Sequence, residues 1–326
     1  MGGGDTNRVQ RAEARWGAIL AATLALLSGT TASAYEAGEV DNGGTITGTV
    51  RLRGTVPEPR AFPMVLYPNG SLCKVISDGR GHVLLKEFNT DEADGLQDAV
   101  IAVQSVQTGK RWTFRENKLV TVNCMFHPAN VPQEDQFGHI EDERVHIHPL
   151  VSIMRNHEVL SVLNLDPVLH AIQAYQKEKG NRVVTFPIPV STKEHGKFLD
   201  MDEDKHIVQI ICAMHEYMQT WGWIVDNPYF AKSRRDGGYS IDQLPPGTYI
   251  VKAWHPHLKP VEEIVTVPEN GAVQLDFEFD AGQVRRPLYE TQTQFRIGPE
   301  RDPTVDLKGC DGPYCVRRKT PVHDHD

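Results

Sequence analysis

The sequence lacks the short motifs that mark the commonest enzyme classes. It contains no Ser/His/Asp nucleophile elbow, no glycine-rich phosphate-binding loop and no zinc-protease helix motif. It also contains no Cys-x-x-Cys-His run, so no haem c is expected to be attached through that motif. We therefore expect a protein that is not an enzyme.

Positive charge is also scarce. The chain has 34 Lys and Arg residues against 43 Asp and Glu residues, which gives a formal net charge of -9 at pH 7. No basic stripe interrupts this acidic excess. Because a phosphate backbone is attracted by clustered Lys and Arg side chains, we expect no nucleic-acid partner.

Only one long apolar run occurs, and it lies near the N-terminus. Residues 16–27 follow three Arg side chains, and residues 32–34 read Ala-Ser-Ala, which has the form of an A-x-A cleavage site. This pattern predicts a secretory signal peptide over residues 1–34, without the adjacent Arg pair of twin-arginine export. No later stretch is apolar enough to span a bilayer, so we expect an exported, periplasmic and soluble mature chain from Tyr35. An uncleaved N-terminal anchor is the alternative.

Helical periodicity is scarce as well, apart from one candidate stretch over residues 167–179. Turn-forming residues recur at short intervals and β-branched residues are common, which predicts an all-β chain. The tail over residues 283–326 is polar, charged and interrupted by Pro, so we expect it to be irregular. The clearest expected strands are 44–54, 98–103, 206–212, 221–225, 236–241, 244–254, 261–267 and 273–279.

The cysteines are few and odd in number. Five occur, so in an exported protein at least one thiol must be free or bound to a metal. Cys212 is our candidate for that thiol. Cys73 with Cys124, and Cys310 with Cys315, are candidate disulfide pairs in an oxidising compartment, although the sequence proves neither.

What is present, and most informative, is the run Cys-Ala-Met-His-Glu-Tyr-Met at 212–218. It offers a thiolate, an imidazole and a thioether within one tight turn. A copper ion that cycles between Cu(I) and Cu(II) prefers a thiolate and two imidazoles, with a weak axial Met. In a β-sandwich an earlier strand can bring His170 beside this loop. We therefore predict one type 1 copper bound by Cys212, His170 and His215, with Met218 axial; the competing interpretation is a buried free Cys beside a surface His and a core Met.

Other groups of potential ligands occur along the chain. Multicopper oxidases contain His-x-His pairs, but they flank the copper Cys with two His, whereas Ile211 and Ala213 flank Cys212. We therefore expect no oxidase chemistry. His146 and His148, with His139 or His157, form a candidate accessory metal site, for which solvated surface histidines are the alternative. The three His-x-His pairs are His146/His148, His255/His257 and His323/His325.

A second Cys-x-x-His run, Cys-Met-Phe-His at 124–127, competes with Cys212 for the metal. No Met follows His127 at the third position, so this run lacks the axial ligand. We interpret Cys124 as half of a disulfide on an early strand.

Segments near both ends of the mature chain resemble carboxypeptidase regulatory-like domains. They read Gly-Thr-Ile-Thr-Gly-Thr-Val at 44–50, Asp-Gly-Gly-Tyr-Ser-Ile-Asp-Gln-Leu-Pro-Pro-Gly-Thr-Tyr at 236–249, and Trp-His at 254–255. In the centre, Asn-Leu-Asp-Pro-Val-Leu-His at 164–170 and the run at 212–218 resemble the ligand segments of plastocyanin and amicyanin-like cupredoxins. The combination is similar to exported methylamine-utilisation-like proteins of bacteria.

The resemblance implies two β-sandwiches. A smaller, transthyretin-like regulatory sandwich would be discontinuous over residues 40–110 and 228–282, with a Greek-key cupredoxin domain inserted over 111–227. Two departures from the cupredoxin pattern stand out. Ala171 replaces the Asn that usually ties the two ligand segments together, and Glu216 replaces a Pro, which adds negative charge where a redox partner would dock.

The function implied is single-electron transfer in the periplasm. Val208, Ile210 and Trp223 are expected to form an apolar shell around the thiolate, and a partly exposed ring of His215 to form the electron portal. Expected partners are a c-type cytochrome or a periplasmic oxidoreductase, met through a small transient interface. A copper carrier or envelope assembly module without rapid redox cycling is one alternative, and a structural exported protein is another.

Overall fold

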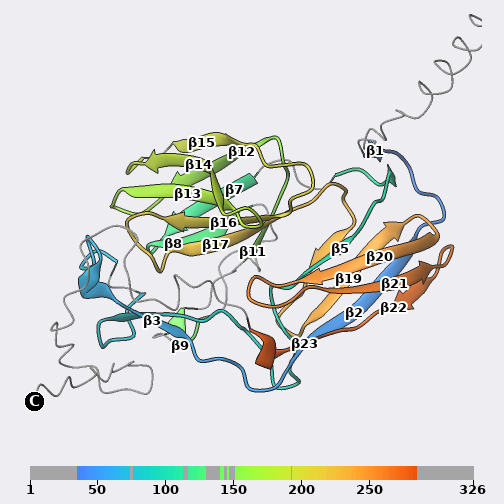
Figure 1. Ribbon diagram of the computed structural model, residues 1–326, viewed down its shortest axis with the longest axis horizontal. Coiled ribbons are helices and arrows are strands. Elements are labelled where there is room, and N and C mark those ends of the chain that lie inside the picture. Colours follow the sequence, from blue (N-terminus) through green and yellow to red (C-terminus); the bar gives the residue numbers. More distant parts are fainter. Residues whose placement is uncertain are drawn as a thin grey trace, which may run out of the picture. The chain divides into compact units, whose positions relative to one another are not determined.

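Every regular element in the described part of the chain is a β-strand or a 3-10 turn (Figure 1), so the expected all-β class is confirmed. No helix long and apolar enough to cross a membrane occurs there. The expected signal peptide, the tail beyond residue 284 with Cys310 and Cys315, and His139, His148, His323 and His325 lie outside the described residues. The computed structural model describes residues 35–73, 76–112, 117–129, 140–142, 145–146, 151–191 and 193–284.

The largest sheet has five strands and brings two expected ligands to one end. Strands β13 and β16 run antiparallel, so His170, which begins β13, lies near Cys212, which ends β16. Both faces of β16 and β17 are almost wholly buried, which explains the nearly continuous apolar sequence of β16. In spatial order the strands are β11 (Val151–Met154), β17 (Gln219–Ile224), β16 (Ile207–Cys212), β13 (His170–Gln176) and β14 (Asn181–Ile188).

The candidate helix over residues 167–179 is wrong, because residues 170–176 of this stretch form strand β13 and the rest is irregular. Along β13, buried residues alternate strictly with half-buried ones. This period of two is that of a strand with one face on the core. Ile172 and Ala174 fill that face, and antiparallel partners on both sides satisfy the backbone. Gly180, with φ +71°, then reverses the chain into β14.

A four-stranded sheet supplies the other half of the core. Leu119, Leu160, Val162 and Leu199 from this sheet belong to one buried cluster with Val208, Ile210 and Cys212 of the five-stranded sheet. Two sheets that share one apolar interior form a β-sandwich. The strands, in order, are β15 (Glu194–Leu199), β12 (Glu158–Asn164), β7 (Asn117–Val122) and β8 (Met125–Pro128).

A segment far upstream also joins this core. Phe62, Met64 and Tyr67 lie in the same buried cluster as Cys212. Cys73 forms a disulfide with Cys124, one of the two pairings that the sequence suggested. The predicted domain limits, including 40–110 for the first part of the regulatory-like sandwich, stay a prediction. The elements of this segment are β3 (Arg60–Pro63), η1 (Met64–Leu66) and β4 (His82–Leu85).

Two further four-stranded sheets contain the other strands expected from the sequence. The expected strand 273–279 is divided in two, because the Asp276 carboxylate accepts the Thr49 N–H, 2.7 Å away, between the two parallel pairings with β2. One sheet is β18 (Phe230–Lys232), β5 (Val100–Val103), β20 (Gly247–Trp254) and β21 (Val261–Val267). The other is β19 (Gly238–Leu244), β2 (Gly44–Arg53) and β22 (Ala272–Gln274), with β23 (Phe277–Asp280) also paired to β2.

Trp223 lies in a second apolar cluster rather than beside Cys212. The ring centroids of Trp223 and Trp254 lie 4.9 Å apart, and Trp221 belongs to the same cluster. Side chains alternate along a strand, so Trp221 and Trp223 occupy the face of β17 opposite Ile224, which lies in the core around Cys212. The remaining short elements are β1 (Glu36–Ala37), β6 (Thr108–Gly109), β9 (Ile140–Asp142), β10 (Val145–His146) and η3 (Ala281–Gln283).

Candidate metal centre

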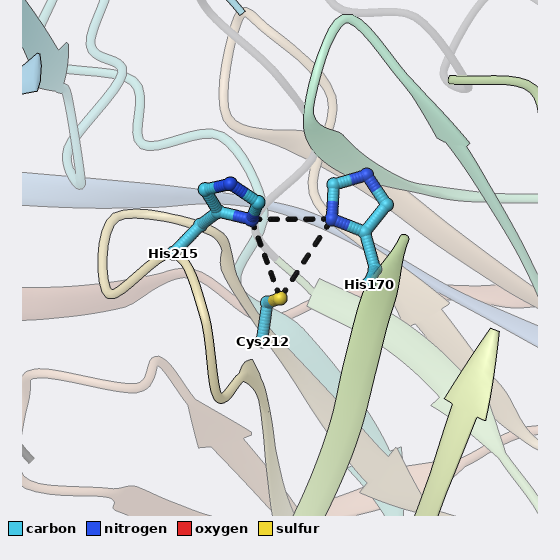
Figure 2. Close-up of side chains that lie close together, drawn as sticks. All are labelled: His170, Cys212 and His215. Atoms are coloured by element: carbon cyan, nitrogen blue, oxygen red, sulfur yellow. Dashed lines mark hydrogen bonds between the residues drawn. The ribbon is translucent and has the colours of Figure 1, made fainter. Parts of the chain in front are cut away.

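Three of the four expected ligands converge at one end of the five-stranded sheet. Figure 2 shows the two imidazole rings pointing their Nδ1 atoms toward each other and toward the Cys212 sulfur. The Cys212 Sγ atom lies 3.7 Å from Nδ1 of His170 and 3.5 Å from Nδ1 of His215, and the two Nδ1 atoms are 3.2 Å apart. All three side chains are buried, at 2%, 0% and 0% exposure.

The backbone of the ligand loop explains why these donors meet. The His215 N–H donates to the Cys212 carbonyl oxygen, and the Met218 N–H donates to that of His215, which closes two tight turns. The Cys212 N–H donates back to the Met218 carbonyl. The Ala213 N–H donates to the Ala171 carbonyl, 2.8 Å away, so a main-chain hydrogen bond ties the two ligand segments together despite the absence of Asn at position 171.

The outer nitrogens of both rings are held by hydrogen bonds. Nε2 of His215 donates to the carbonyl oxygen of Pro68, at 3.0 Å, and Nε2 of His170 donates to Oδ2 of Asp166, at 2.9 Å. The other Asp166 oxygen accepts the Cys124 N–H at 3.0 Å. Because each Nε2 carries a proton, each neutral ring presents a bare Nδ1 lone pair to the other and to the sulfur.

This arrangement fits a metal ion. Two nitrogen lone pairs that face each other at 3.2 Å repel unless a proton or a cation lies between them. Bonds of about 2.3 Å to sulfur and about 2.0 Å to nitrogen would place the donors roughly 3.3–3.8 Å apart, close to the distances found here. His170, Cys212 and His215 can therefore hold a metal ion with little movement.

Without a metal, the same groups favour a thiolate and an imidazolium. Burial raises the pKa of the Cys212 thiol, but hydrogen bonds from His170 and His215 outweigh burial and lower this pKa to about 6. Burial lowers the pKa of His170, but hydrogen bonds to Asp166 and Cys212 raise it to about 9. The thiolate that a metal requires is therefore already favoured near neutral pH.

The expected exposed edge of His215 is wrong. The ring is 0% exposed, because the segment around Pro68 covers it. The expected shell is correct for Val208 and Ile210, which share the cluster of Cys212, and wrong for Trp223. Met218 is 0% exposed and lies in the same cluster, while its role as axial ligand stays a prediction. Glu216 accepts a hydrogen bond from the Tyr67 hydroxyl at 3.2 Å.

Sequence reasoning missed Asp166 and Pro68. Asp166 lies four residues before His170, in the segment 164–170. A carboxylate that accepts a hydrogen bond from a metal-binding His is a recurrent arrangement in metal sites. That spacing was a usable signal. Pro68 acts through its backbone carbonyl, which every residue carries, so no sequence pattern could have identified it.

Among the described residues, the candidate ligands Cys124, His255 and His257 do not join this centre. Cys124 is bonded to Cys73, so it offers no thiolate for a site with His127. His257 lies with its Nε2 atom 3.0 Å from a carboxylate oxygen of Glu87, and both are buried. His255 stacks on Phe88, and burial followed by the charge of His257 lowers its pKa to about 3. The His255/His257 pair is therefore packed in the protein interior.

Comparisons with known proteins identify no family for this chain. No family model matches the chain, and no curated protein matches it. Among solved structures it is similar to a purple cupredoxin from Nitrosopumilus maritimus, at 16% identity and a TM-score of 0.19, over 24% of this chain and 79% of that one. It is also similar to a minor pilin of Streptococcus agalactiae, at 11% identity and a TM-score of 0.15, over 79% and 100% of the two chains. Similarities this weak carry no argument about function.

Proposed function

We propose that this protein is an exported single-copper protein that transfers one electron at a time between redox partners. One observation carries the proposal: the Nδ1 atoms of His170 and His215 and the sulfur of Cys212 face a common point, all within 3.7 Å of one another and all buried. A site of one thiolate and two imidazoles is the trigonal set that type 1 copper prefers. Met218, at the end of the same loop, would supply the weak axial contact.

The surroundings of the donors support electron transfer rather than chemistry on a substrate. Copper bound here would supply one-electron chemistry, since it cycles between Cu(I) and Cu(II). The Asp166 carboxylate and the Pro68 carbonyl fix the orientation of both rings, and the backbone bonds of the ligand loop fix Cys212. A site held this firmly, with apolar side chains such as Val208 around the sulfur, excludes water and limits reorganisation on electron transfer.

The route for the electron differs from the sequence-based expectation. Because the His215 ring is covered, the electron would pass through the segment around Pro68 rather than through a bare ring edge. Partners such as a c-type cytochrome or a periplasmic oxidoreductase would then meet that segment through a small, transient interface. Single-electron transfer changes no bonds in a substrate, so the proposal assigns no catalytic residue.

The test is a visible absorption and EPR spectrum of residues 35–326 after addition of one equivalent of Cu(II). We expect an intense thiolate-to-copper charge-transfer band with narrow copper hyperfine splitting, and both should vanish in Cys212→Ser. A colourless protein, or an ordinary tetragonal Cu(II) signal that survives Cys212→Ser, would contradict the proposal.

The covered ring also favours a second candidate, a copper carrier that holds the metal without rapid redox cycling. A ligand with no exposed edge slows electron exchange between two protein molecules, as does a covering segment. Fast electron self-exchange, measured by NMR line broadening in mixtures of the oxidised and reduced copper forms, would exclude the carrier. Slow self-exchange together with ready copper transfer to an acceptor would favour it.

A further inference from the structure

We propose that the Cys73–Cys124 disulfide is a redox latch on the metal site. While the bond is closed, it holds the covering segment, residues 64–73, over His215. When a dithiol or phosphine reductant opens it, the covering segment loosens and the metal becomes exchangeable. This inference rests on the proposed function, because it assumes a metal at Cys212, His170 and His215.

Cys124 holds one of the two ligand rings in place. Its N–H donates to Oδ1 of Asp166, and Oδ2 of the same carboxylate accepts the hydrogen bond from Nε2 of His170. Asn123 and Cys124 both have left-handed backbone conformations, with φ of 54° and 57°. Two successive non-glycine residues in this conformation persist only where surrounding contacts impose it. The disulfide is one such constraint on the turn that aims the Cys124 N–H.

Cys73 holds the cover of the second ring. Pro68, whose carbonyl accepts the hydrogen bond from His215 Nε2, lies in the same short segment as Cys73. Local hydrogen bonds, such as that from the Cys73 N–H to the Asn69 carbonyl, organise the covering segment, and none of the strand pairings in the described part includes it. Val65 and Leu72 are 77% and 52% exposed, so its outer side faces solvent. The disulfide is therefore the covalent tie between this cover and the turn behind Asp166.

One covalent bond thus links the outer contacts of both ligand rings, in addition to the packing of Met64 and Tyr67 in the shared core. Opening it takes two electrons and two protons and forms two thiols; a dithiol reductant becomes its own disulfide, and a phosphine becomes a phosphine oxide with oxygen taken from water. Without the bond, the Pro68 carbonyl can leave His215 and the Cys124 N–H can leave Asp166. Loss of contacts of this kind weakens metal binding by roughly 10- to 100-fold in other proteins.

The freed Cys124 thiol would also offer the metal an alternative ligand as it leaves the site. Sulfur of Cys124, a carboxylate oxygen of Asp166 and a ring nitrogen of His170 lie within 4.8 Å of one another. All three are buried. A soft ion such as Cu(I) prefers thiolate, so a reduced Cys124 would offer it a second donor group directly behind His170. An oxidising compartment would keep the latch closed and the metal in place.

The experiment measures release of Cu(I) from the copper-loaded full chain. One sample is treated with ascorbate, which reduces the copper and leaves disulfides intact; the other is treated with a phosphine, which reduces both. Bathocuproine disulfonate is then added, and formation of its coloured Cu(I) complex is followed over time. We expect release to be roughly 10- to 100-fold faster after phosphine treatment.

Two cysteine variants separate this disulfide from the other candidate pair. Cys310→Ser/Cys315→Ser should keep the full difference between ascorbate and phosphine. Cys73→Ser/Cys124→Ser should release Cu(I) fast in ascorbate alone. If this second variant does not fold, the phosphine-treated natural chain still provides the test, with thiol counting to show that the bond has opened and near-ultraviolet circular dichroism to follow folding.

The remaining outcomes contradict the latch. Equal release rates with the bond demonstrably open would show that the disulfide does not control the metal, while the proposed function would stand. Fast release accompanied by loss of the near-ultraviolet signal would show that the bond only stabilises the fold. A natural chain that binds no copper in its oxidised form would instead contradict the proposed function itself.

Discussion

Asp166 is a buried carboxylate, 4% exposed, in a position where an unpaired charge would be costly. Its two oxygens accept hydrogen bonds from the Cys124 N–H and from His170 Nε2, so neither is left unsatisfied. Through His170 it would add negative charge to the proposed metal site without itself binding the metal. At the residue scale, Asp166 therefore links the turn at Cys124 to the proposed ligand His170.

We expect Asp166→Asn to weaken Cu(II) binding by roughly 10- to 100-fold and to raise the reduction potential. Removing a negative charge near the metal destabilises Cu(II) more than Cu(I), which accounts for both directions. Competition titration with a chelator measures the affinity, and voltammetry measures the potential. Asp200→Asn, on an exposed surface, is the matched control and should change neither. Unchanged affinity and potential in Asp166→Asn would contradict this role.

The Cys212 thiol should titrate far below its ordinary range in the metal-free protein. Its pKa of about 6 predicts that thiolate absorbance in the ultraviolet appears as the pH rises through about 6 and is lost as the pH falls below it. Since the thiol of the unfolded chain has a higher pKa, its contribution to stability is complete above that higher value and is lost as the pH falls through about 6. The Cys310→Ser/Cys315→Ser background leaves Cys212 as the titrating thiol, and Cys212→Ser should abolish the transition. A midpoint near 9.0, the ordinary value, would contradict the prediction.

At the scale of elements, strand β13 connects the core to the candidate metal site. Ile172 is 0% exposed, lies in the shared core, and pairs in register with Cys212 of β16. His170 begins the same strand. Packing of β13 therefore fixes the distance between the two ligand segments.

We expect Ile172→Ala to lower the free energy of unfolding by about 2–5 kcal/mol, because it leaves a cavity in a core covered on both sides. Denaturant unfolding of the metal-free protein measures the change. Ile264→Ala is the matched control: Ile264 is 73% exposed on β21, so its loss should change stability by only about 0.5 kcal/mol. Similar losses in the two variants would show that β13 does not contribute to the core as described.

The ligand loop could be predicted from local sequence patterns, whereas the strand conformation of β13 could not. The loop residues carry their own chemistry, so the spacing of Cys212, His215 and Met218 indicated a metal site directly. The stretch that forms β13 contains residues that suit either a helix or a strand. Pairing with β14, the next strand along the chain, and with β16, which lies farther away in sequence, determined the strand.

At the scale of the whole molecule, metal binding and folding should be coupled. The three donors come from strand β13, strand β16 and the loop between β16 and β17, so the unfolded chain cannot present them together. A ligand that binds only the folded state stabilises it by about 4 kcal/mol at roughly 1,000 times its dissociation constant.

We therefore expect one equivalent of Cu(II) to raise the thermal unfolding midpoint of the natural chain and to leave that of Cys212→Ser unchanged. Differential scanning calorimetry at equal protein concentration measures both. Removal of the metal with a chelator should return the natural chain to its metal-free midpoint. An equal rise in both proteins would indicate that copper binds elsewhere, as at the exposed histidines.

The sequence by itself determined the all-β class and the set of available donors, because strand periodicity and ligand chemistry are local properties of neighbouring residues. Only the tertiary structure decided that β13 is a strand, that Cys73 pairs with Cys124, that Trp223 faces away from the thiolate, and that Pro68 covers His215. Each of these depends on contacts between segments distant in sequence, and the most consequential one is made by a backbone carbonyl. Such a group is the same in every residue, so its position becomes known only when the chain has folded.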